Sequence, residues 1–355
     1  MASQAGQTLS APAAAGNTVV FGAGDGSVIA RDIFTGVARW STVIASPGRI
    51  QGASILIAGN LVIAEADREV VALDLVSGAV RWRYQPPLDT TNDGFPGYLA
   101  ATHPAVDGSH AYVPAWGASV SAVSLATGTA SWVWRLGRLP TDTAANVFRS
   151  GATGVQLTGD TVLVAVWHWM DIVGGWREAF LVALDRVSGT EFWRLKLPPT
   201  NVANQVEGAP LVVGDMAIVG SAFAWVVGVR LSTRQVVWSY RSPDYKYSTS
   251  GGPAAYGNYI YADGGDLRLY ALNVATGTVV WSAPLGDTGL DIVATDKRVY
   301  VPGGHTLTVV DRATGASVKT IEVPVNVEIF ESAAAAKGDQ IFITRTRGAW
   351  SFREP

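Results

Sequence analysis

The chain has 355 residues, of which 15% are charged, and its 26 basic and 29 acidic side chains leave a net charge of −3. This balance excludes the basic surface that a nucleic-acid backbone or an anionic membrane requires. Cysteine is absent, which excludes disulfides, thiolate nucleophiles, iron–sulfur clusters and cysteine-bound zinc.

The N-terminal segment is the first feature in chain order. Residues 1–15 are mostly small or polar and lack the charged start and apolar run of a signal peptide. No part of the sequence reaches the ~18 consecutive apolar residues of a membrane-spanning helix. Two alternatives fit: an extracytoplasmic protein whose signal or lipid anchor has been removed, and a cytosolic protein.

One motif recurs along the chain. Ala-x5-Gly-x3-Trp occurs in five ungapped copies, which begin at Ala30, Ala72, Ala122, Ala183 and Ala271. Two altered copies complete the series, Gly228-Arg234-Trp238 and Val309-Gly315-Lys319. The repeat length of about 46 residues is typical of propeller blades. Two β-rich runs precede each copy, and the Gly follows Thr or Ser at a hairpin, so each repeat predicts one four-stranded antiparallel sheet.

The predicted fold is all-β, a single domain over residues 1–355 that forms an eight-bladed β-propeller of four-stranded antiparallel blades. The blades are expected at about 9–44, 50–84, 98–136, 150–197, 207–241, 250–285, 291–323 and 331–353. The last blade has only three predicted strands. Residues 1–8 could supply its outer strand and so remove an open sheet edge. The alternative is seven blades with a C-terminal tail.

Six tryptophans lie on the last strand of their repeats. Each is predicted to lie across the neighbouring blade and to bury on the order of 200 Å² there: Trp40, Trp82, Trp132, Trp193, Trp238 and Trp281. Four aspartates precede the hairpin Gly by four residues, where a short carboxylate can accept hydrogen bonds from the amides of the turn: Asp32, Asp74, Asp185 and Asp311. We expect both sets to be structural.

This motif resembles the tryptophan-docking repeat of the pyrroloquinoline quinone (PQQ) family of propellers, over nearly the whole chain. The Trp-Asp pair of WD-repeat propellers is absent. The resemblance implies a propeller but not an activity. One branch is non-catalytic and includes the propeller lipoprotein of the outer-membrane β-barrel assembly machinery. That branch implies a scaffold without a cofactor, located in the periplasm, at the cell surface or outside the cell. It is expected to bind a protein partner, or another ligand, with the loop-rich face around the central channel.

The other branch consists of PQQ- and calcium-dependent dehydrogenases, in which carboxylate and amide oxygens hold the calcium ion and many members carry adjacent cysteines. This chain has no Cys and is shorter, so we predict no cofactor and keep PQQ with Ca²⁺ as the alternative. Oxygen ligands near predicted inner strands are Asp93, Asn146, Asn204, Glu207, Asp287, Asp291, Asn326, Glu328 and Glu331. The four histidines lack metal-ligand spacing and are predicted as surface or strand residues: His103, His110, His168 and His305.

The loops that depart from the repeat are the candidates for binding, because loop excess on one face of a rigid scaffold indicates a binding surface. An insertion at 168–179 in the fourth repeat has the composition of an interface anchor, with Trp167, His168, Trp169, Asp171, Trp176 and Arg177. A second loop contains Tyr245, Lys246 and Tyr247. We predict that these residues contact the partner. The alternative is that they pack on their own loops and cap the channel.

Overall fold

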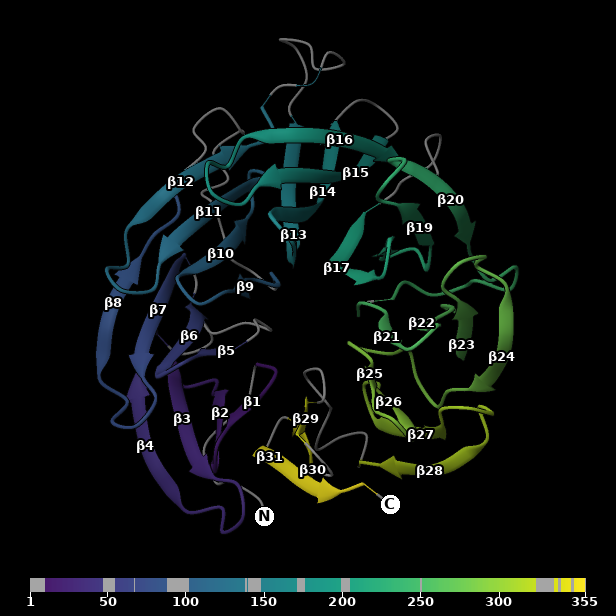
Figure 1. Cartoon of the computed structure of the whole chain (residues 1–355). Coiled ribbons are helices and arrows are strands. Elements are labelled where there is room, and N and C mark those ends of the chain that lie inside the picture. Colours follow the sequence, from purple (N-terminus) through teal and green to yellow (C-terminus); the bar gives the residue numbers. More distant parts are fainter. Residues whose placement is uncertain are drawn as a thin grey trace.

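The fold is a ring of β-sheets. The computed structural model describes residues 10–46, 55–66, 68–87, 102–137, 139, 148–170, 176–198, 205–249, 251–323, 335–337, 340–345 and 348–354. In these ranges the chain forms 31 strands in eight antiparallel sheets. The sheets stand around a central axis as the blades of a propeller (Figure 1). The predicted eight-bladed fold is therefore confirmed, and the eighth sheet is a blade of the ring.

The first four blades follow one another in chain order. Blade 1 consists of β1 (Ala13–Ala15), β2 (Thr18–Gly22), β3 (Ser27–Asp32) and β4 (Ala38–Val43). Blade 2 consists of β5 (Leu56–Ala58), β6 (Leu61–Ala66), β7 (Glu69–Asp74) and β8 (Val80–Tyr84). Blade 3 consists of β9 (Ala105–Val106), β10 (His110–Ala115), β11 (Ser119–Ser124) and β12 (Ala130–Arg135). Blade 4 consists of β13 (Phe148–Thr158), β14 (Thr161–Met170), β15 (Trp176–Asp185) and β16 (Glu191–Leu197).

The remaining blades complete the ring. Blade 5 consists of β17 (Val206–Val213), β18 (Met216–Ser221), β19 (Val226–Arg230) and β20 (Gln235–Tyr240). Blade 6 consists of β21 (Ala254–Tyr256), β22 (Tyr259–Asp263), β23 (Arg268–Asn273) and β24 (Val279–Pro284). Blade 7 consists of β25 (Val293–Ala294), β26 (Arg298–Pro302), β27 (Thr306–Asp311) and β28 (Ser317–Glu322). Blade 8 consists of β29 (Ala335–Lys337), β30 (Gln340–Arg345) and β31 (Gly348–Arg353).

Each blade runs from the axis to the rim, with its first strand innermost and its fourth outermost (Figure 1). Blade 8 has three strands within the described residues and lies between blades 7 and 1, with β29 in contact with β1. The predicted contribution of residues 1–8 to its outer edge lies outside the described residues. The part of the chain described by the structure contains no helix able to cross a membrane.

The core lies between the blades. Side chains alternate along a strand, so neighbours in sequence point to opposite faces of a blade. On β6, Val62 and Ala64 join the core shared with blade 1, whereas Ile63 joins the core shared with blade 3. Because both faces are covered, the middle strands are buried almost throughout, and the sequence reads as a continuous apolar run rather than an alternating one.

The turn before each outer strand is fixed by its aspartate. The Asp74 carboxylate accepts hydrogen bonds from the amides of Val76 and Ser77 at 3.0 and 2.8 Å, and it pairs with Arg81 at 2.7 Å. The Arg81 contact and these hydrogen bonds hold the pKa of Asp74 well below its usual range. Gly78 closes the turn with φ of 71°. Asp32, Asp185 and Asp311 accept the same pair of turn amides.

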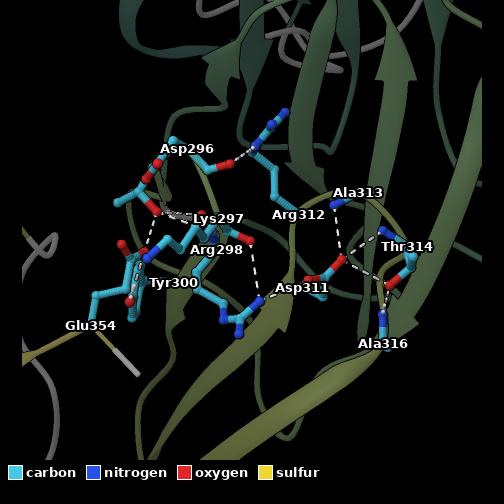
Figure 2. A network of polar contacts seen from close by, with 11 residues as sticks. Asp296, Lys297, Arg298, Tyr300, Asp311, Arg312, Ala313, Thr314, Ala316 and Glu354 are labelled. Carbon is cyan, nitrogen blue, oxygen red and sulfur yellow. Dashed lines mark hydrogen bonds and ion pairs between the residues drawn. The ribbon is translucent and has the colours of Figure 1, made fainter. Parts of the chain in front are cut away.

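Blade 7 shows this turn beside the attachment of the C-terminal strand (Figure 2). Asp311 pairs with Arg298 at 2.7 Å and accepts hydrogen bonds from its own turn. Glu354, which follows β31, accepts a hydrogen bond from the Tyr300 hydroxyl at 3.2 Å and another from the Thr295 hydroxyl. These contacts fasten the end of blade 8 to blade 7, where the ring closes.

The docking tryptophans reach from each outer strand to the next blade. Four indole Nε1–H groups donate to a backbone carbonyl there at 2.8–3.1 Å: Trp40 to Leu75, Trp82 to Leu125, Trp132 to Arg186 and Trp238 to Val274. Trp281 lies against Gly315 in the same way, with a Cβ on that glycine 2.5 Å from the ring. Trp193 packs in the core between blades 4 and 5.

Candidate functional site

The site candidates lie on one face of the ring. Because consecutive strands are antiparallel, the turn between the second and third strands of a blade and the link from its fourth strand to the next blade lie on the same face. The turns before each outer strand lie on the opposite face. We call the face that carries the turns between second and third strands and the links between blades the link face.

The hairpin of blade 4 extends toward the link face. Its first three strands are ten or eleven residues long, and β14 pairs with β15 as far as Met170 and Trp176. Asp171 lies outside the described residues, and for Trp176 and Arg177 the structure describes the backbone alone. The length of the hairpin agrees with the insertion seen in the sequence.

The three aromatic and imidazole side chains of β14 lie mostly inside the protein. Trp167 is 7% exposed, and its ring meets Trp116 of blade 3 edge to face at 6.0 Å. His168 is fully buried, and Trp169 is half-buried against the core between blades 4 and 5. Trp167 and His168 therefore hold the base of the hairpin. The predicted partner contact by this hairpin stays a prediction.

The loop after β20 is anchored by its backbone and by a cation–π contact. The amides of Lys246 and Tyr247 both donate to the carbonyl of Gly265 in blade 6 at 2.8 Å. The Arg241 guanidinium lies 3.6 Å from the centre of the Tyr245 ring and 5.5 Å from that of Trp225. Tyr245 is half-buried by these contacts, whereas Lys246 and Tyr247 (48% exposed) reach solvent. The loop thus presents a cation and an aromatic ring from a fixed backbone.

Backbone strain gathers on the link face. Ala118, Ala224 and Leu267 have φ of 47°, 56° and 62°, a region that side chains other than glycine rarely adopt. All three lie in turns between second and third strands, in blades 3, 5 and 6. Strained residues tend to cluster at functional sites, because function selects a geometry that local preference opposes. No sequence pattern marks these positions.

A cleft of about 670 Å³ opens on the same face between blades 1 and 2. It is lined by Val43, Ile44, Ala45, Ser46, Ala66, Arg68, Glu69 and Gln85. One wall is braced by Arg83, which bonds to Glu69 at 2.6 Å and to the carbonyl of Ile44 at 3.1 Å. No sequence motif marks this cleft, because its residues come from three separate segments: a strand end, a turn and a link.

A polar cluster occupies the axis. His103 Nε2 lies 3.0 Å from Asp291 Oδ2, although 188 residues separate them. Burial disfavours the charged imidazole, but the Asp291 carboxylate outweighs it and raises the pKa of His103 to about 9. Beside them, the buried Glu65 accepts a hydrogen bond from the Thr102 hydroxyl at 2.6 Å. Burial raises the pKa of Glu65 to about 8.

The described oxygen ligands do not fit a calcium ion with PQQ. Asp291 is paired with His103, Glu207 accepts a hydrogen bond from Gln205, and Asp287 accepts the amides of Thr288 and His305. Within the described ranges no three His, Asp or Glu side chains lie close enough to hold a metal ion. The other candidates lie outside these ranges: Asp93, Asn146, Asn204, Asn326, Glu328 and Glu331.

Comparisons with known proteins agree with the fold. The sequence profile of the family described as outer membrane protein assembly factor BamB matches residues 52–166 and 117–349. Protein Rv3035 of Mycobacterium tuberculosis (strain ATCC 25618 / H37Rv) is 38% identical over 69 residues, which are 19% of this chain and 17% of that protein.

Two solved structures share the architecture. The crystal structure of BamB from Moraxella catarrhalis is similar with a TM-score of 0.63 and 21% identity, over 83% of this chain and 81% of that chain. The quinohemoprotein alcohol dehydrogenase ADHIIG from Pseudomonas putida HK5 is similar with a TM-score of 0.73 and 10% identity, over 98% of this chain and 71% of that chain. At these identities the likeness concerns the fold.

Proposed function

The chain belongs to the family of the outer membrane protein assembly factor BamB, and on that premise we propose that it is a non-catalytic scaffold that binds a protein partner with its link face. The observation that carries this proposal is the loop of Lys246 and Tyr247. Its backbone is fixed on Gly265, so the backbone of the loop loses little conformational entropy when a partner binds.

The composition of the surrounding surface supports the proposal. Tyr247 and Leu267 are 48% and 37% exposed, and both lie at the turn of blade 6 that contains Gly265. Tyrosine at a rigid position supplies a large contact area with only two side-chain torsions to restrict. Arginine and tryptophan, present here as the stack of Arg241 on Trp225, are also enriched where binding energy concentrates.

We place the scaffold outside the cytoplasm, in the cell envelope. The support comes from the family, whose name refers to the assembly of outer membrane proteins. The absence of cysteine is compatible with an oxidising compartment, because no thiol is left to oxidise. Fractionation of cells that express the gene with its native start tests the compartment, and recovery in the cytosol alone would contradict it.

The binding proposal is tested by affinity capture from the source cells followed by titration of the captured protein. We expect Lys246→Ala combined with Tyr247→Ala to weaken binding by at least about tenfold, as for hot-spot residues. The matched control is Val187→Ala, because Val187 is 82% exposed but lies on the opposite face. Equal affinities for the two variants would contradict a link-face interface.

A further inference from the structure

One residue of each blade occupies an equivalent position next to the axis. In each blade, the third residue of the second strand pairs with one residue of the inner strand. The equivalent position is two residues before that inner-strand residue. By this register His103 of blade 3 and Asp291 of blade 7 are equivalent to each other. The equivalent residues of the other blades for which the structure describes the position are small: Ala11, Gly154, Ala209 and Gly252.

At the two glycine positions, close approach of neighbouring atoms leaves little room for a larger residue. A Cβ on Gly154 would lie 2.5 Å from the Cα of Ala209, and a Cβ on Gly252 would lie 3.3 Å from Asp291 Oδ1. Blades 3 and 7 are four blades apart in a ring of eight, so they face each other across the axis (Figure 1). Of the six described residues at this level, only His103 and Asp291 carry polar side chains, and they come from opposite blades.

Each partner of the pair is held by the neighbouring blades. The His103 amide donates to the carbonyl of Thr153 in blade 4 at 2.8 Å, and the Thr153 hydroxyl donates to the carbonyl of Gly208 in blade 5 at 3.1 Å. On the other side, Asp291 Oδ1 accepts the amide of Gly252 in blade 6 at 2.5 Å. The pair therefore joins the inner ends of blades 3 and 7, each of which is also hydrogen-bonded to a neighbouring blade.

We propose that the His103–Asp291 ion pair is a strut across the central channel, which locks the opposite blades 3 and 7 together. The strut depends on both charges, so loss of either charge releases it. This inference does not depend on the partner or on the link face. It concerns how the ring is held together at its axis.

The protonation of His103 sets the pH range in which the strut exists. The titratable groups that act on it are Asp291 from blade 7 and Glu65 from blade 2. Its pKa is raised from 6.5 to about 9. The stabilisation is complete between pH 3.8, the ordinary pKa of Asp291, and pH 6.5; it is lost as the pH rises through 9 and His103 loses its proton, and in acid as Asp291 gains one. Glu65 titrates in an overlapping range, so the experiment is done in a Glu65→Gln background as well.

The first test is a double-mutant cycle on the full chain, with thermal unfolding of His103→Gln, Asp291→Asn and the double variant at pH 7. Each single variant is expected to lower the unfolding midpoint by about 2 to 4 °C or more. If the strut exists, the double variant loses clearly less than the sum of the two. Additive losses would overturn the proposal.

The second test uses the unmodified protein, so its outcome does not depend on whether a variant folds. The pKa of the His103 imidazole is measured by NMR in the unmodified protein, where the shifted value is itself the signature of the pair. A pKa above about 8 supports the strut, because an isolated histidine titrates near 6.5. A pKa at or below about 7 would show that the carboxylate is not paired with it in solution, and would overturn the proposal.

Discussion

The indole of Trp40 in blade 1 lies so close to Gly78 in blade 2 that a Cβ at position 78 would stand 2.6 Å from the ring. The same contact recurs between Trp82 and Gly128 and between Trp132 and Gly189. Each glycine therefore serves two purposes at once: it adopts a positive φ at the turn and leaves room for the tryptophan of the preceding blade. The regular recurrence of Gly and Trp in the sequence motif reflects this contact between neighbouring blades.

The contact of Gly78 with the indole can be tested separately from the geometry of its turn. Gly59 also has a positive φ, 59°, but nothing lies within 4 Å of the Cβ it would carry. We expect Gly59→Ala to cost about 1 kcal/mol from backbone strain. Gly78→Ala should cost about 1 to 3 kcal/mol more, because the indole has to move. Chemical denaturation measures both, and equal costs would contradict the docking contact.

Trp193 tests the docking role in the core between blades 4 and 5. Trp193→Ala should destabilise the protein by about 3 to 5 kcal/mol, as expected for loss of a large core side chain. The matched control is Phe192→Ala, since the neighbouring Phe192 is 51% exposed and points away from that core. A cost for Trp193→Ala under about 1 kcal/mol, or one equal to that of the control, would mean that this tryptophan does not hold the blades together.

Blade 5 carries an arginine where the other complete repeats carry the hairpin glycine. Arg234 has φ of 56°, a conformation that costs a side chain about 1 to 2 kcal/mol. Arg234→Gly should therefore raise the stability by about 1 kcal/mol, measured by chemical denaturation. Arg234→Ala keeps the Cβ and should give no such gain. If both variants change the stability by the same amount, backbone strain at Arg234 does not explain the change.

Glu65 predicts a pH dependence of stability. Its pKa is raised from 4.5 to about 8, because burial disfavours the carboxylate more than the Thr102 hydroxyl stabilises it. The folded state therefore holds this proton more tightly than the unfolded state, and stability falls as the pH rises from 4.5 through 8. Glu65→Gln should flatten the unfolding midpoint over this range. The exposed Glu322→Gln serves as control and should leave the slope unchanged.

Addition of PQQ and calcium tests the enzymatic alternative. Because the described carboxylates are engaged separately and form no common site, we expect no quinone absorbance band and no dye reduction with alcohols or sugars. The positive control is a quinoprotein dehydrogenase loaded under the same conditions. Stoichiometric binding of PQQ together with dye reduction would replace the scaffold proposal by the dehydrogenase alternative.

The sequence predicts the fold well because the repeat encodes contacts within and between adjacent blades. Spacing of Ala, Gly and Trp places the hairpin and the docking residue in every complete repeat, and even the altered repeat with Arg234 keeps its sheet. The sequence of the last repeat contains no such motif, so a source for a fourth strand could be proposed only from the open sheet edge.

The site is harder to predict, because it depends on which residues the ring brings together. His103 and Asp291 belong to different repeats, and their shared position is visible only once the strand register is known. Composition predicts Trp167 and His168 as contact residues; both side chains lie inside the protein, with Trp167 in the core between blades 4 and 5, and their contact with a partner stays a prediction. The residue types of the Tyr247 loop predict a contact with a partner, but they do not predict that its backbone is anchored on Gly265.

Site-specific photocrosslinking tests the central claim, that the link face binds a partner protein. A photoreactive amino acid is placed at position 247 on the link face and, in a second variant, at position 187 on the opposite face. Both native side chains are exposed, so both variants should fold. We predict a discrete crosslinked protein from position 247 and none from position 187 in cells. Crosslinking from position 187 alone would contradict the account.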